Sequence, residues 1–457
     1  MRTDLAVIGA GPAGLAAALA AAARGVRVTV LDAAPAPGGQ YYRQPAAGLG
    51  ARRPEALHHQ WRTWERLRDG LAASEVTVLT DHHVWALEHG FTVHALHGPE
   101  QREPVAVRAD AVLLATGGYE RVFPFPGWTL PGVVTAGGAQ AMLKGTLVVP
   151  GRRAVVAGTG PLLLPVATGL AAAGVDVAAL VESADPRGFL RHAGVLAVKV
   201  PEGAGYAARL LRHRIRFLPR HMVVRANGDD TLTAVTVAAL DAGGRVRTGT
   251  ERLIVCDTLA VGHGMLPHTD LAESLGCRLD GPAVRVDGEQ RTDVPGVWAA
   301  GEATGIGGAG LALAEGHLAG CSIAARLRGT EPDPRQWSAA ARSRGRLRRA
   351  ARGLDSAYPP PPHWTEQVTD DTVVCRCEEV TAGAVREAVA ALGAGDLRTV
   401  KLLTRAGMGW CQGRICAPAV AGVAGCETTV SRRPFARPVP LGVLACRHDD
   451  ATEEGPS

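Results

Sequence analysis

The chain has 457 residues, of which 46% are hydrophobic and 20% are charged, and its formal net charge is +5. This length exceeds what one hydrophobic core supports, so two or three domains are expected. The charge is too small for the length to indicate nucleic-acid binding, and no apolar stretch is long enough to span a bilayer. Only Met1 to Thr3 precede the first apolar segment, which leaves no room for a signal peptide and favours a cytoplasmic protein.

The N-terminal segment D-L-A-V-I-G-A-G-P-A-G-L predicts a strand, a glycine turn and a helix. In such a turn the first glycine (Gly9) permits the tight bend and the second (Gly11) lets a pyrophosphate approach. The third (Gly14) lets the helix pack on the strand. The helix starts at Pro12 and Ala13, and its N-terminus attracts phosphate charge. The sequence therefore predicts a dinucleotide site here.

A second strand is expected at residues 26–31, and it ends in Asp32. This carboxylate is placed to accept a hydrogen bond from a ribose hydroxyl. The next segment, P-G-G-Q-Y-Y-R-Q, contains Gly39 and Gln40. It is expected either to line the pocket of the cofactor or to cover the adenosine.

Two later segments resemble the fingerprints of flavoproteins that have two dinucleotide domains. L-L-A-T-G-G-Y-E-R contains Thr116 and Gly117 and resembles the A-T-G crossover of that group. T-D-V-P-G-V-W-A-A-G-E ends in Gly301 and Glu302, and the resemblance implies that this acid contacts the ribityl chain of FAD. A glycine-rich turn and a helix follow, and the helix N-terminus could face the flavin. All three motifs agree on FAD at the N-terminal site.

A second glycine turn begins at Arg153 with A-V-V-A-G-T-G-P-L-L-L. Gly158 and Gly160 fit a phosphate turn, but Leu163 replaces the third glycine and is expected to push the helix away from the strand. A later strand ends in Glu182. Three interpretations remain open: an NAD(P) site, a site for another adenine nucleotide, and a vestigial structural domain.

Four cysteines form two close pairs near the C-terminus: Cys375 with Cys377, and Cys411 with Cys416. Reduced thiols of this kind bind soft metals rather than form disulfides. Zinc sites usually place two to four residues between paired cysteines, whereas one and four residues separate them here. Glycines near the second pair allow backbone N–H groups to reach sulfur, which is typical of iron–sulfur clusters. The pattern favours a [2Fe-2S] cluster over zinc.

The segments V-C-R-C-E-E-V-T and T-R-A-G-M-G-W-C-Q-G-R-I-C resemble the bacterioferritin-associated-ferredoxin type of [2Fe-2S] domain. In this domain we expect a helix capped by Thr381 with Val385, Ala388, Val389 and Leu392 on one apolar face. No cysteine precedes Cys256, so the redox disulfide of flavin disulfide reductases is absent.

The expected fold class is α/β, with two Rossmann-like dinucleotide-binding domains and a small helical [2Fe-2S] domain. The basic stretch from Arg335 to Arg352 is interpreted as the solvated face of a helix, with a docking surface for an acidic partner as the alternative. The tail could wrap over the cluster domain. The expected parts are an FAD domain (1–127 and 288–329), an inserted NAD(P)-binding-like domain (128–287), a basic and proline-rich linker (330–370), the cluster domain (371–428) and the tail (429–457).

Over nearly its whole length the chain resembles the alpha subunits of heteromeric FAD-dependent amino-acid and opine dehydrogenases. The distinctive run F-P-F-P-G-W-T-L-P-G-V, which begins at Phe123, carries much of this resemblance. The resemblance implies that a beta subunit similar to D-amino-acid oxidases oxidises the amine, with or without a small third subunit. The present chain would then receive the electrons, and no catalytic side chain is assigned to it.

Electron relay is the function this combination favours, because a flavin accepts two electrons and a [2Fe-2S] cluster accepts one. One alternative is a self-sufficient NAD(P)H oxidoreductase that reduces an external acceptor. The other is a non-catalytic cluster carrier or redox sensor. The sequence identifies neither the substrate nor the terminal electron acceptor.

Overall fold

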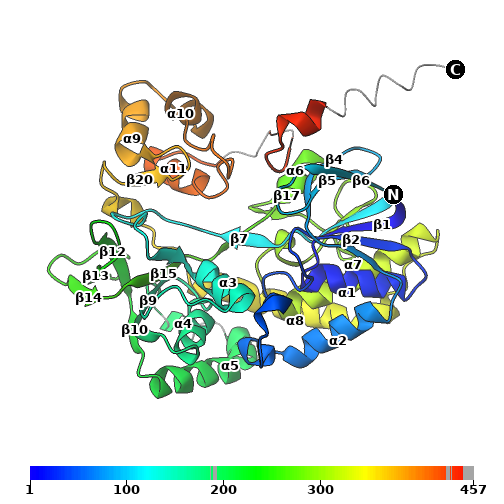
Figure 1. Cartoon of the computed structure of the whole chain (residues 1–457), viewed down its shortest axis with the longest axis horizontal. Helices are drawn as coiled ribbons and strands as arrows, with labels where there is room; N and C mark the ends of the chain where they lie inside the picture. Colours follow the sequence, from blue (N-terminus) through cyan, green and yellow to red (C-terminus); the bar gives the residue numbers. More distant parts are fainter. Residues whose placement is uncertain (186, 189–192, 429–432, 434, 446–457) are drawn as a thin grey trace.

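The computed structural model describes residues 1–185, 187–188, 193–428, 433 and 435–445. Figure 1 shows two sheet-containing halves, a small helical unit formed by the C-terminal residues, and a pair of strands that runs between the halves. The predicted α/β class, with two Rossmann-like units and a helical C-terminal unit, is confirmed. Within the described part of the chain, no helix is both long and apolar enough to cross a membrane.

The first sheet has seven strands, ordered β3-β2-β1-β6-β5-β4, and β19 also pairs with β6. Its parallel part joins β1, β2, β3, β6 and β19, whereas β4, β5 and β6 pair antiparallel. The strands are β1 (Arg2–Ile8), β2 (Val28–Leu31), β3 (Thr77–Leu79), β4 (His82–Leu87), β5 (Thr92–His97), β6 (Glu103–Leu114) and β19 (Val297–Ala299). All of β2 and the last four residues of β1 are buried, because helices cover the parallel part of the sheet.

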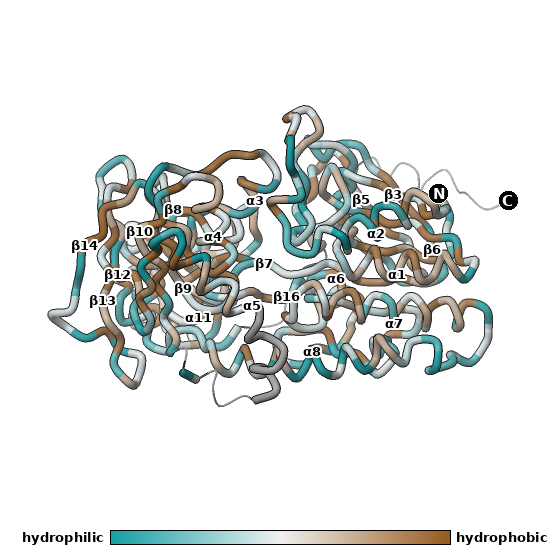
Figure 2. Tube along the Cα trace, turned by 90° about the horizontal axis from the view of Figure 1, so that it is seen from below, coloured by the Kyte–Doolittle hydropathy of each residue, from teal (hydrophilic) through white to brown (hydrophobic). Residues whose placement is uncertain are grey.

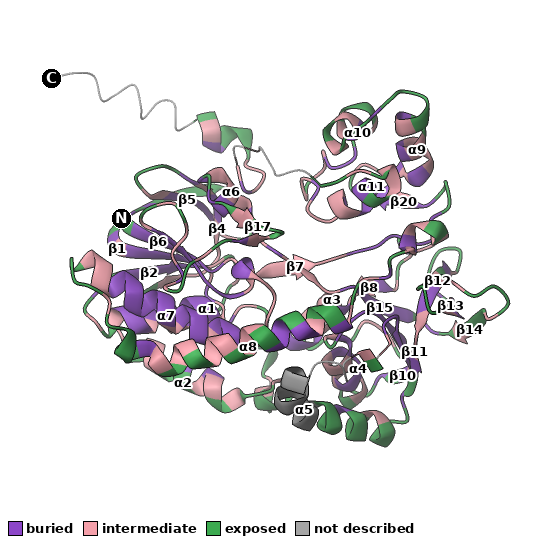
Figure 3. Ribbon diagram, turned by 180° about the vertical axis from the view of Figure 1, so that it is seen from behind, coloured by how far each residue is buried: buried purple, intermediate pink, exposed green. Residues whose placement is uncertain are grey.

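Two helices rich in alanine and glycine pack closely beside this sheet, and both are largely buried (Figure 3). They are α1 (Pro12–Ala22) and α7 (Ala309–Leu327). A methyl group on Gly316 would lie 2.0 Å from the carbonyl oxygen of Ala13, and one on Gly320 would lie 2.3 Å from that of Ala17. The glycines of α7 therefore bring the backbones of the two helices into direct contact.

The other helices of the first half are α2 (Trp61–Ala72), α6 (Asp270–Ser274) and α8 (Ser338–Ala357). Short 3-10 helices occur at Ala47–Leu49, Pro54–Leu57, Gly301–Thr304, Pro334–Trp337 and Trp364–Gln367. Figure 3 shows α8 alongside α7 with an exposed outer face. The basic part of the expected linker is thus a helix that packs on the first half.

The second sheet has five parallel strands ordered β11-β10-β9-β15-β8. They are β8 (Val133–Thr135), β9 (Arg153–Gly158), β10 (Asp176–Glu182), β11 (Arg216–Pro219) and β15 (Thr258–Gly262). Its helices are α3 (Ala136–Thr146), α4 (Leu163–Ala172) and α5 (Ala193–Arg212). An antiparallel sheet of β12 (His221–Asn227), β13 (Ala234–Ala239) and β14 (Arg252–Val255) shares one hydrophobic core with it.

The two halves are joined by β7 (Gly118–Glu120) and β16 (Met265–Pro267), which pair antiparallel. Figure 2 shows this pair running between the two lobes. A short hairpin of β17 (Leu279–Asp280) and β18 (Ala283–Val284) follows. β7 comes directly after the A-T-G segment, so that segment leads from the first sheet straight into the connection.

The C-terminal unit consists of β20 (Val373–Cys375), β21 (Val380–Thr381), α9 (Ala382–Ala390), α10 (Leu397–Thr404) and α11 (Ala417–Ala424). The predicted cap is confirmed, since the Thr381 hydroxyl accepts a hydrogen bond from the Ala384 N–H. Val385 and Ala388 are buried, as expected. The expectation for Leu392 is wrong: α9 ends at Ala390, and Leu392 is exposed.

The run that starts at Phe123 docks this unit onto the second half. The rings of Phe123 and Trp364 stack at 4.6 Å, and the Trp128 indole N–H donates to the carbonyl of Val373 at 2.6 Å. The Arg376 guanidinium lies over the Trp128 ring. The distinctive aromatic run therefore holds the cysteine-bearing unit in place.

The described tail residues contact the cysteine-bearing unit through the Ala436 carbonyl, as expected, but they also pack on the first half, which was not expected. The Phe435 ring meets Trp85 edge to face at 5.0 Å, and the Ala436 N–H donates to the Trp85 carbonyl. Trp85 lies in β4 and is buried. Its indole offers the tail a large apolar surface on the first half, which accounts for this packing. From the sequence, the residues past Cys446 are also expected to be disordered, and they lie outside the described part of the chain.

Candidate functional site

The first glycine turn is formed by close backbone contacts. Gly9 has a φ of +108°, and a methyl group there would lie 2.3 Å from the Ala115 carbonyl oxygen. A methyl group on Gly14 would lie 1.9 Å from the Gly9 carbonyl oxygen. Only glycine satisfies both positions, so the N-terminus of α1 is fixed against the ends of β1 and β6.

The other flavin motifs meet at the same helix N-terminus. Gly39 approaches Gly11, since a methyl group on Gly39 would lie 2.8 Å from the Gly11 Cα. Gly301 packs on Ala13 in the same way, also at 2.8 Å. Pro12 is the first residue of α1. Segments far apart in the sequence thus surround one anion-binding helix start, and this cradle fits the pyrophosphate of FAD.

Asp32 follows β2 and reaches into the turn. Its carboxylate accepts hydrogen bonds from the N–H of Ala10 at 2.5 Å and of Ala34 at 2.7 Å. Burial raises the pKa of Asp32, and the two N–H groups oppose that rise. The side chain therefore stays fixed at the carboxyl end of β2, the position that a ribose-binding acid needs.

The A-T-G turn is bonded to the backbone of His268 through Thr116 and Gly117, whereas Gln40 lies at the surface. The Thr116 hydroxyl donates to the His268 carbonyl at 2.6 Å, and the His268 N–H donates to the Gly117 carbonyl at 3.0 Å. Gln40 is exposed, and its side-chain oxygen accepts a hydrogen bond from Arg43 at 2.9 Å. The A-T-G turn is thus tied to the segment after β16.

The Gly301–Glu302 motif is held by a buried acid that the sequence analysis missed. Glu315 is fully buried and accepts hydrogen bonds from the Gly301 N–H at 3.0 Å and the Thr304 hydroxyl at 3.1 Å. Glu302 itself is partly exposed; desolvation raises its pKa, and a hydrogen bond from the Gly308 N–H opposes that rise. Glu315 therefore fixes the turn, and Glu302 lies at the surface of the turn.

Arg348 completes this arrangement from α8. Its guanidinium pairs with Glu315 at 2.6 Å and donates to the Thr304 carbonyl at 2.6 Å. Arg344, one turn earlier, donates to Gln290 and to the Gly288 carbonyl. The expectation that the arginines of this helix form a solvated face is wrong for these two. Their spacing of four residues places both arginines on one face of the helix, and this was the sequence signal for a shared contact surface.

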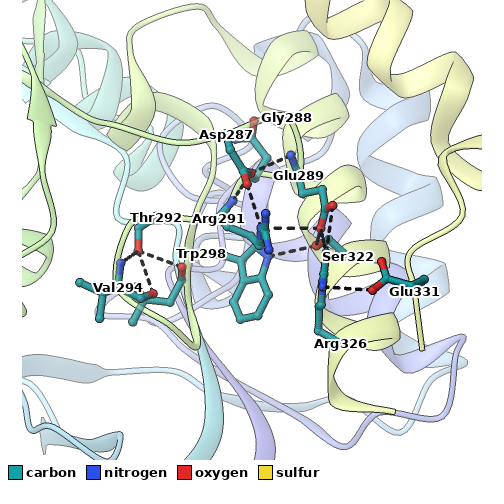
Figure 4. A network of polar contacts seen from close by, with 12 residues as sticks. Asp287, Gly288, Glu289, Arg291, Thr292, Val294, Trp298, Ser322, Arg326 and Glu331 are labelled. Carbon is teal, nitrogen blue, oxygen red and sulfur yellow. Dashed lines mark hydrogen bonds and ion pairs between the residues drawn. The ribbon is translucent and has the colours of Figure 1, made fainter. Parts of the chain in front are cut away.

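A polar network anchors β19 to α7 (Figure 4). The Trp298 indole N–H donates to the Ser322 hydroxyl at 3.2 Å, and Ser322 donates to Glu289 at 2.9 Å. Arg326 pairs with Glu289 at 3.2 Å. Since Trp298 precedes Gly301 by only three residues, this network sets where the motif emerges from the sheet.

The second glycine turn differs from the first. α4 begins only at Leu163, whereas α1 begins directly after Gly11. Leu163 is 2% exposed and joins the core of the second sheet. The expected separation of helix and strand stays a prediction. Gly158 retains the close contact, because a methyl group there would lie 1.7 Å from the Gly262 carbonyl oxygen.

Side chains of two other segments contact this turn. The Gly160 N–H donates to Glu182 at 2.9 Å, and the Thr159 hydroxyl bonds with Ser183 at 2.5 Å. A methyl group on Gly160 would lie 4.0 Å from the Cβ of Tyr358, which follows α8. Neither Tyr358 nor its packing was predicted. Glu182 thus holds the second turn much as Asp32 holds the first, and Tyr358 is an additional neighbour of Gly160.

Glu182 predicts a pH dependence of stability. Burial raises its pKa from 4.5 to about 7, although the Ala184 and Gly160 N–H groups oppose this. The folded protein therefore binds more protons than the unfolded chain between these values, so this group lowers stability as pH rises from about 4.5 to 7. We expect Glu182→Gln to remove up to about 3 kcal/mol of that loss.

The measurement is urea unfolding of wild type and variant at several pH values from 5 to 8. Glu251→Gln is the matched control, since Glu251 is exposed in the same half. A wild-type-minus-variant difference in unfolding free energy that does not change with pH would contradict the assignment.

The four predicted metal-binding cysteines lie in two segments. Cys375 and Cys377 are at the end of β20 and just after it, and Cys411 and Cys416 are in the loop before α11. Cys375 and Cys416 are buried and Cys377 is exposed, with Cys411 between these extremes. The Cys411 side chain interacts with those of Cys416 and Cys377, and the Cys416 side chain also interacts with that of Cys375. Contact with Cys416, together with backbone N–H groups, lowers the pKa of Cys411 to about 4, while the pKa of Cys416 is raised by Cys411.

Glycines shape the space around the thiols. The Gly407 N–H donates to the Cys375 sulfur at 3.5 Å. A methyl group on Gly409 would lie 2.1 Å from the Cys377 Cβ, so a side chain there would displace the loop. An N–H donor to sulfur and an all-thiol donor set fit an iron–sulfur cluster. In the described residues, His, Cys, Asp and Glu side chains form no group of three or more placed to hold a single metal ion.

Comparison with known proteins agrees with both sites. Residues 3–343 match the family described as pyridine nucleotide-disulphide oxidoreductase, and residues 373–423 match the BFD-like [2Fe-2S] binding domain. Together the two families indicate FAD and a [2Fe-2S] cluster as cofactors, with an NAD(P)-type second nucleotide fold.

Relatives match the chain over most of its length. It is 36% identical to an opine oxidase subunit of Agrobacterium tumefaciens (strain Ach5), covering 97% of this chain and 89% of the relative. It is 35% identical to hydrogen cyanide synthase subunit HcnB of Pseudomonas aeruginosa, covering 90% of each.

Among solved structures, L-proline dehydrogenase from P. horikoshii has the same fold, with a TM-score of 0.66, 20% identity and coverage of 97% of this chain and 79% of that one. The chain therefore belongs to the pyridine nucleotide-disulphide oxidoreductase family, as a member that carries a C-terminal BFD-like [2Fe-2S] binding domain.

Proposed function

We propose that this oxidoreductase is the electron-transfer component of a heteromeric dehydrogenase that oxidises an amino acid or an opine. One observation carries the proposal: a flavin-type glycine cradle and a four-cysteine loop pair occur in one chain, with the cysteine-bearing unit docked on the rest. The similarity to an opine oxidase subunit over 97% of the chain supports the substrate class and the need for other subunits. We propose a cytoplasmic location, where the thiols stay reduced.

The protein's contribution is to hold and separate the two redox groups. When bound, FAD accepts an electron pair and the [2Fe-2S] cluster accepts single electrons, so together they convert two-electron into one-electron transfer. Gly11 and the start of α1 would bind the pyrophosphate, Asp32 the ribose, and Glu302 the flavin side of the cofactor. Cys375, Cys377, Cys411 and Cys416 would bind the cluster. No described side chain is assigned to the oxidation of the amine.

The amine-oxidising partner is proposed to be a flavoprotein similar to D-amino-acid oxidases. A partner of this kind would supply the substrate pocket that this chain does not need. The second glycine turn argues against NAD(P)H as the electron source, because buried Leu163 replaces its third glycine and α4 starts later than α1 does. One experiment tests both the proposed partner and the electron source.

We expect amino or imino acids to bleach the flavin only when this chain is co-expressed with such a partner. The measurement is anaerobic absorbance of the flavin and cluster bands with a panel of substrates, with and without the partner. NADH and NADPH added to the chain alone should leave the flavin oxidised. Bleaching by either one would support the self-sufficient NAD(P)H oxidoreductase instead, and iron without stoichiometric flavin would support a cluster carrier.

A further inference from the structure

The loop between Cys411 and Cys416 carries one arginine that reaches out of the C-terminal unit. The Arg414 guanidinium donates to both carboxylate oxygens of Asp270, at 3.0 and 2.8 Å. Both side chains are largely buried, at 15% and 13% exposure. A bidentate ion pair of this kind is directional and strong, because two parallel hydrogen bonds fix its geometry.

The same arginine holds the cysteine loop. Its third donor reaches the carbonyl oxygen of Cys411 at 3.1 Å, and it also donates to the carbonyl of Ala436 in the tail. Arg414 therefore joins a predicted cluster ligand, the tail and the first half of the molecule through one side chain. Since lysine has no planar fork, it could not make these contacts together.

Asp270 continues the connection toward the flavin motif. Its carboxylate also pairs with the His268 imidazole at 3.1 Å. The backbone of His268 bonds to Gly117 at 3.0 Å and to the Thr116 hydroxyl at 2.6 Å. Thr116 follows β6, and a methyl group on Gly9 would lie 3.6 Å from its nitrogen. Cofactors of open parallel sheets bind beyond the carboxyl ends of the strands, which is where this turn lies.

Charged groups around Asp270 come from several elements. Arg433 of the tail lies 3.5 Å from Asp270. Glu273 of α6 interacts electrostatically with Arg433 and with Tyr119 of β7, and Tyr119 also interacts with Asp270. Although burial alone would raise the pKa of Asp270, hydrogen bonds from His268 and Arg414 lower it to about 2. The carboxylate is therefore ionised, and its pairing with Arg414 persists at all ordinary pH values.

We infer that Arg414 is a positioning residue for electron transfer, holding the cysteine loop at the near end of a hydrogen-bonded path that leads through Asp270 and His268 to the A-T-G turn. The inference rests on the proposed function. With both cofactors bound, each transfer would move one electron from the reduced flavin to the oxidised cluster, which would pass it to an external one-electron acceptor. Two such transfers would return the flavin to its oxidised form and release its protons to solvent.

The contact also complements the aromatic docking site. Phe123 and Trp128 tie the C-terminal unit to the second half, whereas Arg414 ties it to the first. Figure 1 shows the C-terminal unit and α6 over different halves of the molecule. Without Arg414 the unit would stay attached through the aromatic site and the tail, but the loop between Cys411 and Cys416 would lose its own ion pair with the flavin half.

The test measures electron passage within the isolated chain after laser photoreduction of its flavin. We expect Arg414→Ala and Asp270→Asn to keep wild-type iron and flavin contents but to slow cluster reduction by at least about tenfold. The double variant should be no slower than either single variant, because both remove one contact. Arg414→Lys should give an intermediate rate, and Arg398→Ala, an exposed arginine of α10, should match wild type.

A second readout does not require cofactors. Hydrogen exchange of the apoprotein should become faster in β16 and α6 in Arg414→Ala, while the β20 contact with Trp128 keeps its protection. Wild-type transfer rates in Arg414→Ala and Asp270→Asn, or additive effects in the double variant, would overturn the inference. Neither measurement uses a partner or an amine, so the result is independent of whether the proposed dehydrogenase function holds.

Discussion

Serine substitution of a cluster cysteine is expected to remove iron while leaving flavin in place. Cys377 is the best position, because its side chain is exposed and serine there does not disturb the core of the C-terminal unit. The hydroxyl is a much poorer ligand for iron than a thiolate. We expect Cys377→Ser to lose most of its iron, and electron flow to a one-electron acceptor to fall by more than about tenfold.

The measurements are iron, sulfide and flavin content per chain, with the electron paramagnetic resonance signal of the reduced protein. Cys426→Ser is the matched control, since Cys426 is a partly exposed thiol of the same unit outside the two pairs. We expect it to retain the cluster. Full iron content in Cys377→Ser, or zinc in place of iron in the wild-type protein, would contradict the cluster assignment.

The largest effect on folding is expected from Gly316→Ala. The added methyl group would lie 2.0 Å from the Ala13 carbonyl oxygen, which belongs to the backbone of α1 and cannot rotate away. The two helices would have to separate, and α1 carries the start of the flavin cradle. We expect a loss of about 3 kcal/mol or more in unfolding free energy, together with weaker flavin retention.

Gly310→Ala provides the matched control in the same helix. A methyl group there would lie 3.7 Å from a Leu347 side-chain carbon, which is an ordinary contact. Alanine also favours helix over glycine, so a neutral or slightly stabilising change of about 0.5–1 kcal/mol is expected. Thermal unfolding and flavin fluorescence on release distinguish the two variants. Equal stability of Gly316→Ala and Gly310→Ala would show that the contact between α1 and α7 is not limiting.

Local patterns predicted much of the fold and of the first site. The strand, glycine turn and helix around Gly9 need only a few neighbouring residues, and so does the cap at Thr381. Pattern reasoning placed the ends of elements less well. The second strand was expected from residue 26 but starts at Val28, and Leu392 lies beyond the end of α9. Hydrophobic periodicity does not locate where a helix stops when the last turn has no strong signal.

Contacts between distant segments were not predictable in the same way. Whether an arginine of α8 faces solvent depends on a buried acid in α7, and the sequence pattern alone could not pair Arg348 with Glu315. The role of Phe123 and Trp128 depends on the placement of a unit more than two hundred residues later. The packing of Tyr358 beside the second glycine turn depends on the path of the chain after α8.

By itself the sequence determined the cofactor chemistry, because glycines and cysteines at short spacing impose the same backbone and ligand geometry wherever they occur. Tertiary structure decided which charges are buried, where the helix after the second glycine turn starts and how the cysteine loop meets the flavin half. These outcomes depend on desolvation and on partners brought together by folding. A buried charge is tolerated only where a distant residue pairs with it, as Arg414 does with Asp270.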